Sequence, residues 1–137
     1  MKLTRYRVTN FRSVKDSGWI DCNDVTTLIG VNEAGKSNLL LALWKLKPAK
    51  GGAINLLQDM PRRHYSEWRD AAEKPVFIET YFELPDDLVQ QVVGLSNAVA
   101  ANVRTVSVSR NYNGIWLIFS PKQQTQLAFL EKWWKHC

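Results

Sequence analysis

The fold of this chain is decided by the segment Gly30-Val31-Asn32-Glu33-Ala34-Gly35-Lys36-Ser37, which matches the pattern G-x-x-x-x-G-K-[ST] at every fixed position. A β-branched run precedes it at 25–29, and a stretch rich in Leu and Ala follows at 37–47 and stops at Pro48. The order strand, glycine loop, helix is the context in which this pattern forms a phosphate-binding loop. The segment therefore predicts a P-loop fold.

Each residue type in this loop has a chemical task. The glycines at 30 and 35 let the backbone curl around an anion, so that several N–H groups converge on it. The helix expected to begin near Lys36 directs the positive end of its dipole at the same phosphates, and the Lys36 ammonium reaches the β and γ oxygens. The Ser37 hydroxyl is expected to bind Mg²⁺. We therefore expect ATP and Mg²⁺ as the cofactors.

Strand and helix signals alternate along the rest of the chain, which predicts an α/β fold. Period-2 alternation predicts strands at 3–9 and, most clearly, at 76–84. Two β-rich runs, 104–111 and 115–119, flank Asn113-Gly114 and predict a hairpin. We expect a mixed sheet, in which antiparallel N-terminal strands and this hairpin join the P-loop strand and helix.

Helices and loops are expected between these strands. Residues 49–75 predict a long loop with a short helix near 65–72, and Pro85-Asp86-Asp87 opens a helix that runs to about Val99. Ser120-Pro121 predicts the start of a last helix, because a capping serine is followed by proline at the first helical position. Trp133-Trp134 near its end predict an apolar surface that further polypeptide or a partner covers.

Length and composition fit one globular domain. The chain has 137 residues, of which 45% are hydrophobic and 23% charged, and this excludes a disordered, collagen-like or coiled-coil protein. The longest strongly apolar run, 39–44, is far shorter than the roughly 20 residues that cross a bilayer. Because the start is charged and lacks the apolar region of a signal peptide, we expect a cytoplasmic protein with no membrane partner.

The charge distribution, the cysteines and the histidines give weaker indications of function. Residues 1–50, 51–103 and 104–137 have net charges of +5, −4 and +4, so the two basic ends either form a face for phosphates or nucleic acid or are ordinary solvated surface. Cys22 and Cys137 are expected to be reduced. Neither His64 nor His136 has a partner at metal-ligand spacing, so no zinc site is expected.

A second motif makes the assignment more specific. The segment Asn10-Phe11-Arg12-Ser13 ends the first strand some twenty residues before the P-loop, which continues as Lys36-Ser37-Asn38-Leu39-Leu40. Together the two segments resemble the N-terminal ATPase lobe of RecF/SMC-like ABC ATPases, and the form Asn-Glu-Ala-Gly-Lys-Ser is most similar to the OLD family, which comprises AAA-type ATP-binding proteins with a nuclease domain.

The resemblance implies a set of nucleotide-binding residues and an activity. Arg12 and Ser13 would lie near the nucleotide, Asn32 would belong to the loop around the terminal phosphates, and the remaining binding residues would be Gly30, Glu33, Ala34, Gly35, Lys36, Ser37 and Asn38. ATP would clamp two lobes together, as a homo-oligomer or with a partner lobe, and act as a conformational switch for work on DNA. The similarity to the OLD family implies a role in antiphage defence or DNA processing.

The parts that hydrolysis needs are not recognisable. No apolar strand ends in an Asp-Glu pair, and Asp86-Asp87 are better explained as a helix start. The glutamine of the Q-loop is open among Gln58, Gln123, Gln124 and Gln126. We therefore predict that residues 1–137 form the N-terminal part of one ABC-type ATPase domain, divided into 1–48, 49–75 and 76–137, and we assign no catalytic residue.

Two other functions remain open. One is a RecF- or SMC-like repair ATPase without a nuclease, and the other is a non-catalytic nucleotide-sensing or assembly module. Arg62-Arg63-His64 with Tyr65 and Trp68 either form a nucleic-acid patch or, as we favour, a loop that packs its aromatic rings on the body and leaves arginine in water. Trp44 is expected in the core, and His64, without a carboxylate partner in the sequence, has no catalytic role.

Overall fold

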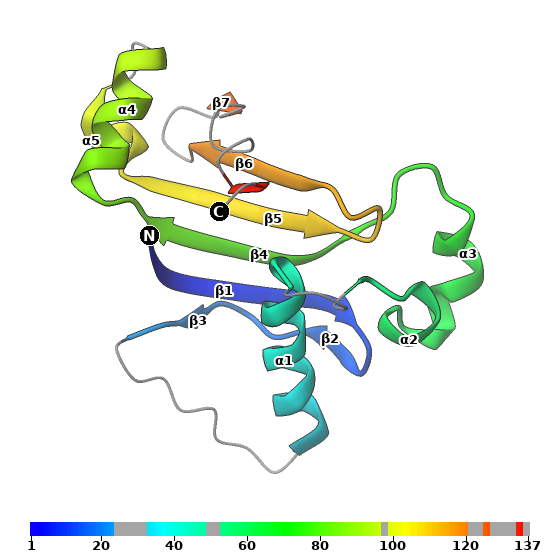
Figure 1. Ribbon diagram of the computed structural model, residues 1–137. Helices are drawn as coiled ribbons and strands as arrows, with labels where there is room; N and C mark the ends of the chain where they lie inside the picture. The colour runs from blue at the N-terminus through cyan, green and yellow to red at the C-terminus, as the bar shows by residue number, and fades with distance from the viewer. Residues whose placement is uncertain (24–32, 49–52, 97–98, 121–124, 127–133, 136–137) are drawn as a thin grey trace.

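An antiparallel sheet forms the centre of the molecule (Figure 1). The computed structural model describes residues 1–23, 33–48, 53–96, 99–120, 125–126 and 134–135, with backbone alone at 33–34, 96 and 125–126. The strands are β1 (Lys2–Phe11), β2 (Val14–Asp16), β3 (Ile20–Asp21), β4 (Val76–Glu83), β5 (Thr105–Asn111), β6 (Trp116–Ser120) and β7 (Thr125–Gln126). Their order is β2-β1-β4-β5-β6-β7, and β3 also pairs with β1.

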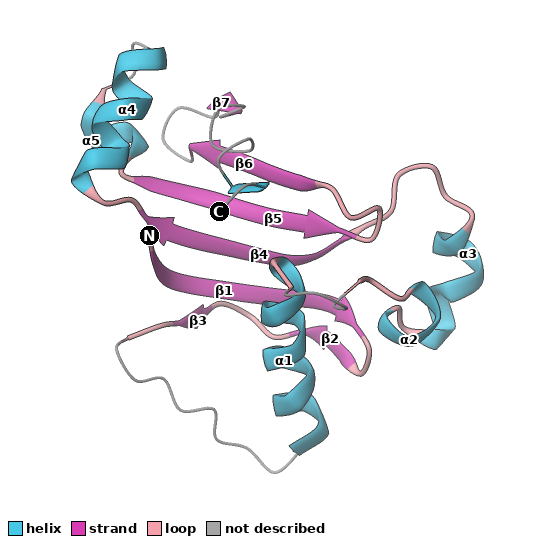
Figure 2. Cartoon of the chain, viewed as in Figure 1, coloured by secondary structure: helices cyan, strands magenta, loops and turns pink. Residues whose placement is uncertain are grey.

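Helices lie on one face and at two ends of this sheet (Figure 2). They are α1 (Glu33–Leu46), α2 (Leu56–Asp59), the 3-10 turn η1 (Arg62–His64), α3 (Tyr65–Arg69), α4 (Asp86–Ser96) and α5 (Ala100–Val103). Helix α1 packs on β1, β2 and β4, while α2 and α3 lie at one end and α4 and α5 at the other. No helix in the described part of the chain is long and apolar enough to cross a membrane.

The α/β class is confirmed, and the described strands pair antiparallel throughout. The expected P-loop strand at 25–29 lies outside the described residues. The strands predicted at 3–9 and 76–84 are confirmed as β1 and β4, with Val8 opposite Ile78. A bulge between Val76 and Ile78 turns Phe77 into the core as well, where its ring lies 5.5 Å from that of Phe11.

The predicted hairpin is also confirmed, as β5 and β6. Gly114 has a φ of 80°, a conformation that glycine adopts without steric cost. The Asn111 side-chain oxygen accepts hydrogen bonds from the Asn113 and Ile115 amides, at 3.1 and 3.0 Å. The left-handed conformation of Gly114 explains why the Asn-Gly pair was a good signal, and the bonds to Asn111 close the turn.

The C-terminal prediction was wrong at its start. Ser120 does not cap a helix: it ends β6, is buried, and donates its hydroxyl to the Asn102 carbonyl at 2.6 Å. Thr125–Gln126 form β7 on the edge of β6, because ladder hydrogen bonds at an open sheet edge outweigh a local capping signal. Trp134 is not left uncovered either: it is 7% exposed and packs 5.6 Å from the ring of Phe82.

Helix α1 buries one face only. Ala42, Lys45 and Leu46 are buried, whereas Leu40 is 57% exposed and Trp44 is 45% exposed. The expectation that Trp44 belongs to the core was therefore wrong. A helix that is apolar nearly all round predicts burial on all sides, but the described elements cover α1 from the sheet side alone.

The C-terminal end of α1 is bound to the sheet by two side chains. Arg110 donates to the Lys45 carbonyl at 2.7 Å, and the Trp116 indole nitrogen donates to the Leu46 carbonyl at 2.6 Å. The Arg110 guanidinium lies over the Trp116 ring, 4.3 Å from its centroid, and burial lowers its pKa. A cation at the end of a helix, where carbonyls lack partners, stabilises the helix.

We expect Trp116→Phe to destabilise the fold by about 1–3 kcal/mol, because it leaves the buried Leu46 carbonyl without its donor. Urea unfolding followed by circular dichroism measures this change. The matched control is Trp19→Phe, an exposed ring beside Tyr81, which should change stability by about 0.5 kcal/mol or less. Equal effects of the two substitutions would show that the Leu46 bond contributes nothing.

The hairpin of β1 and β2 turns through two residues in the left-handed region, Asn10 at φ 51° and Arg12 at φ 52°. Non-glycine residues rarely adopt this conformation. The other end of the hairpin is tied by Arg7, which donates to the two carboxylate oxygens of Asp16 at 3.0 and 2.6 Å. This bidentate pair and the Gly18 amide lower the pKa of Asp16 to about 2.

We expect the Asp16 carboxyl to titrate near pH 2 and Arg7→Gln to raise its pKa toward the usual value of an aspartate, as followed by carboxyl-carbon NMR. Because the folded pKa lies below the unfolded one, the pair stabilises the fold above about pH 4 and this contribution is lost as the pH falls toward 2. Arg69→Gln, which breaks the similar Arg69–Asp70 pair, should leave the Asp16 titration unchanged.

Candidate functional site

The predicted phosphate loop leads into α1. Gly30 and Asn32 lie outside the described residues. The helix begins at Glu33, three residues before the predicted start near Lys36, so Glu33, Ala34 and Gly35 belong to its first turn. An acidic residue and alanine are favourable in a first helical turn, which accounts for the earlier start.

Lys36 and Ser37 follow in the same helix. The Lys36 side chain is half-buried and has no hydrogen-bond or ion-pair acceptor among the described residues, and Ser37 is exposed. The described residues contain no cluster of three His, Cys, Asp or Glu that could hold a metal ion. A single serine hydroxyl suits Mg²⁺, which usually keeps several waters and takes its other ligands from phosphates.

The turn between β1 and β2 lies against this helix. The Asn38 side-chain amide donates to the Ser13 hydroxyl at 2.8 Å, which joins two residues that are 25 positions apart in the sequence. The structure therefore brings Ser13 into contact with Asn38, the residue that follows Ser37, and the sequence had singled out both. Arg12, the neighbour of Ser13, lies in the same turn.

Arg12 is held by a buried carboxylate that the sequence did not single out. Asp59 at the end of α2 has no exposed surface, and its Oδ1 accepts from Arg12 Nε at 3.3 Å and Nη2 at 3.1 Å. Its Oδ2 accepts from the Lys45 ammonium and from the Asn55 amide, the latter at 2.9 Å. We call Arg12, Lys45, Asn55 and Asp59 the Asp59 cluster.

Backbone bonds fix the same turn. The Arg12 amide donates to the Asp59 carbonyl at 2.8 Å. The Tyr112 hydroxyl lies within hydrogen-bond distance of the carbonyls of Asn10 and Asp59, at 2.5 and 3.0 Å. Burial, and secondarily the charge of Asp59, raises the pKa of Tyr112, so this hydroxyl stays protonated and able to donate.

A signal for part of this arrangement was present in the sequence. Asn55 caps α2, and its side-chain oxygen accepts from the amides of Leu57 and Gln58 at 3.1 and 3.2 Å. Asparagine before an apolar pair is a recognisable helix start. It locates α2, but nothing local shows that Asp59 faces Arg12 and Lys45.

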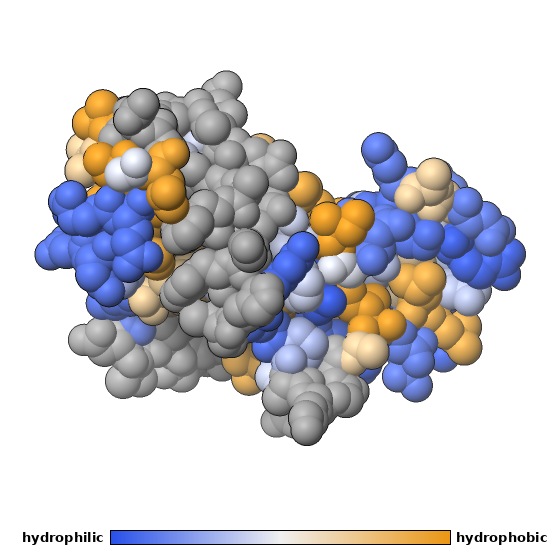
Figure 3. Space-filling model, turned by 45° about the horizontal axis from the view of Figure 1, so that its top comes forward, coloured by the Kyte–Doolittle hydropathy of each residue, from blue (hydrophilic) through white to orange (hydrophobic). Residues whose placement is uncertain are grey.

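A groove of about 1370 Å³ runs between the β1–β2 turn, Asn38 of α1 and the segment from α2 to α3. Among the described residues, four cations and no acidic residue line it: Arg12, Lys15, Arg62 and Arg63. We call it the basic groove. At the right of Figure 3, the side on which α2 and α3 lie, hydrophilic and hydrophobic residues lie next to one another on the surface.

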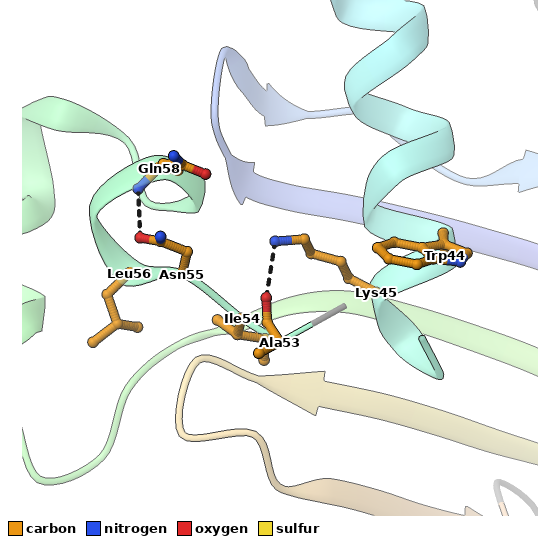
Figure 4. A pocket seen from close by; sticks show the side chains of 7 residues that line it. All are labelled: Trp44, Lys45, Ala53, Ile54, Asn55, Leu56 and Gln58. Atoms are coloured by element: carbon orange, nitrogen blue, oxygen red, sulfur yellow. Dashed lines mark hydrogen bonds between the residues drawn. The ribbon is translucent and has the colours of Figure 1, made fainter. Parts of the chain in front are cut away.

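A smaller pocket of about 530 Å³ lies on the other side of α2, between that helix and the end of α1 (Figure 4). Lys45 points across it and donates to the Ala53 carbonyl at 3.3 Å, while Trp44 lies along its edge. Gln58 lines both this pocket and the basic groove. Among the four glutamines considered for the Q-loop, Gln58 is the one with a described side chain.

The packing that the favoured interpretation predicted around Arg62-Arg63-His64 is confirmed, and it leaves both arginines on the surface. Tyr65 and Trp68 are half-buried against the core, and both arginines are exposed. His64 stacks on Trp68, with ring centroids 4.3 Å apart. A carboxylate does lie near His64, since Glu67 is 3.7 Å from Nδ1 one helical turn later, but the pair is open to solvent.

Asp86 and Asp87 form the first turn of α4, as expected, and Asp86 accepts from Arg104 at 2.7 Å. These two residues therefore have a structural role at a helix start. In the described part of the chain, no strand ends in an Asp-Glu pair.

Comparison with known proteins identifies the family. An uncharacterised protein of Methanocaldococcus jannaschii is 36% identical over 88 residues, which cover 61% of this chain and 24% of that protein. The chain thus spans about a quarter of the length of this relative. Residues 1–133 match the family described as AAA ATPase domain. Since this match covers nearly the whole chain, the protein belongs to the AAA ATPase domain family.

Proposed function

We propose that this chain binds MgATP through the loop 30–37 and the residues packed beside it. The observation that carries the proposal is the hydrogen bond from Asn38 to Ser13, because it joins the Asn-Phe-Arg-Ser turn to the helix of Lys36 and Ser37. Membership of an ATPase family supports nucleotide use. The proposed binding residues are Gly30, Asn32, Glu33, Ala34, Gly35, Lys36, Ser37 and Asn38, with Arg12 and Ser13.

The residue types suit a polyphosphate. Amides at the start of α1 and the Lys36 ammonium favour negative charge, and the Ser37 hydroxyl would hold Mg²⁺. When bound, Mg²⁺ neutralises charge on the β and γ oxygens. The outer edge of the Arg12 guanidinium, turned to the basic groove, would donate to phosphate oxygens. Because the described strands supply no Asp-Glu pair, we propose binding for this chain, and hydrolysis for a longer protein of which it would form the N-terminal part.

We expect this chain to bind MgATP in calorimetric titration and Lys36→Ala to abolish measurable binding, because the lysine is the one side-chain cation of the loop itself. Lys135→Ala removes an exposed lysine outside the site and serves as the matched control. A folded Lys36→Ala variant that binds MgATP as well as the unchanged chain would refute the proposal.

We further propose that the complete protein is an OLD-like ABC-type ATPase that acts on DNA, in antiphage defence or DNA processing. ATP would close two such lobes on each other and so act as the switch. The four cations of the basic groove and the net charge of +5 support a polyanionic partner. Arg62 and Arg63 lie on its outer wall, where a nucleic-acid backbone has access.

We expect the double variant Arg62→Ala/Arg63→Ala to weaken binding of a fluorescent DNA oligonucleotide and to reduce the slope of log K against log salt by about 1–2, as the loss of two phosphate contacts requires. Fluorescence anisotropy at several salt concentrations measures both quantities. Arg69→Ala is the control, since Arg69 pairs with Asp70 outside the groove. An unchanged salt slope in the double variant would exclude this surface as the DNA contact.

A further inference from the structure

The Asp59 carboxylate is saturated with donors from three parts of the fold. Arg12 comes from the β1–β2 turn, Lys45 from α1 and the Asn55 amide from the start of α2. A fully buried carboxylate is retained only when it is paired and hydrogen-bonded, and here both oxygens have two donors each. The position of each donor is therefore fixed by the same anion.

Arg12 differs from Lys45 in the number of hydrogen-bond donors that remain available to a ligand. The Lys45 side chain is 8% exposed, and its ammonium donates to Asp59 and to the Ala53 carbonyl. The Arg12 side chain is 33% exposed and lines the basic groove. A guanidinium has five N–H donors, and Arg12 uses two of them on Asp59, the single acceptor of this side chain within the described residues.

The cluster also keeps a net positive charge, since two cations share one carboxylate. Arg12 stands in a left-handed backbone conformation that Asp59 itself secures, through the bond from the Arg12 amide to its carbonyl. Such strained conformations persist where surrounding contacts determine them, and they gather at ligand sites. Asp59 therefore holds both the backbone and the side chain of Arg12.

We propose that Asp59 is a positioning residue of the nucleotide site, which holds the Arg12 guanidinium beside Ser13 and Asn38 so that its remaining donors face the phosphates. This inference rests on the proposed function, in which Arg12 contacts the nucleotide. Without Asp59 the guanidinium swings into the groove, and the ordering of a long side chain then counts against binding.

The test is a double-mutant cycle on the full chain, with the Kd for MgATP measured by calorimetry. Arg12→Ala should weaken binding about tenfold, the value of one charge-assisted contact. Asp59→Asn should weaken it about fivefold in the unchanged chain and less than about twofold in the Arg12→Ala background, because it acts through Arg12. Asp70→Asn, the same substitution at an exposed pair, is the matched control and should have no effect.

Lys45→Met separates positioning from a merely structural role. It breaks the other ion pair of the same carboxylate but leaves Arg12 on Asp59, so the Kd should stay within about twofold. A fivefold loss in Lys45→Met, or an Asp59→Asn effect that is as large in the Arg12→Ala background, would overturn the inference while MgATP binding through Lys36 still stands. Absence of binding by the unchanged chain would overturn the proposed function and this inference together.

Asp59→Asn leaves the buried Lys45 and the partly exposed Arg12 without their anion, so its folding is checked first by thermal unfolding. If it does not fold, the charge-balanced variant Lys45→Met/Asp59→Asn replaces it in the cycle, with Lys45→Met as its reference. Failure of that variant to fold would also overturn the inference, because Asp59 would then be a residue of the core and no more.

Discussion

The carboxylate of Asp59 is the constraint on which the site depends. It lies in the interior with no exposed surface, and a charge in that position is tolerated only with compensating charges and hydrogen bonds around it. Arg12 and Lys45 supply the charges and Asn55 an amide, so three elements must meet at one point. Moving α1 relative to the Arg12 turn would strip this anion of a partner. The position of Arg12 at the groove is therefore determined by Asp59, a buried group that does not itself line the groove.

A second set of bonds fixes the C-terminal end of α1, the same end at which Lys45 pairs with Asp59. Arg110 and Trp116 donate to the last carbonyls of α1, and Trp116 also carries the Arg110 guanidinium on its ring. With Asn38 bound to Ser13 near its start, α1 is tied to the sheet at both ends. Lys36 and Ser37 directly precede Asn38 in this helix, so these bonds bear on where the two residues lie.

The accuracy of the sequence predictions followed the range of the interactions that decide each element. Strands β1 and β4 and the hairpin of β5 and β6 were predicted, because alternation and an Asn-Gly turn act between near neighbours. The helix start expected at Ser120 and the burial of Trp44 were wrong, since both depend on what lies opposite: an open sheet edge that Thr125–Gln126 join as β7, and an uncovered face of α1. The strands β2 and β3 were missed because they are short and are held by pairing with β1.

By itself the sequence determined which residue types are available for binding phosphate. The loop 30–37 and the Asn-Phe-Arg-Ser segment predict the residues of a phosphate site and an ATPase fold, because that chemistry needs fixed residue types at fixed spacing. Only the tertiary structure decided how Arg12 is held. Its partner Asp59 is 47 residues away along the chain, and Lys45 reaches that carboxylate across 14 residues. No local sequence pattern predicts these ion pairs, because the partners of a buried charge are the groups that lie next to it in the folded core.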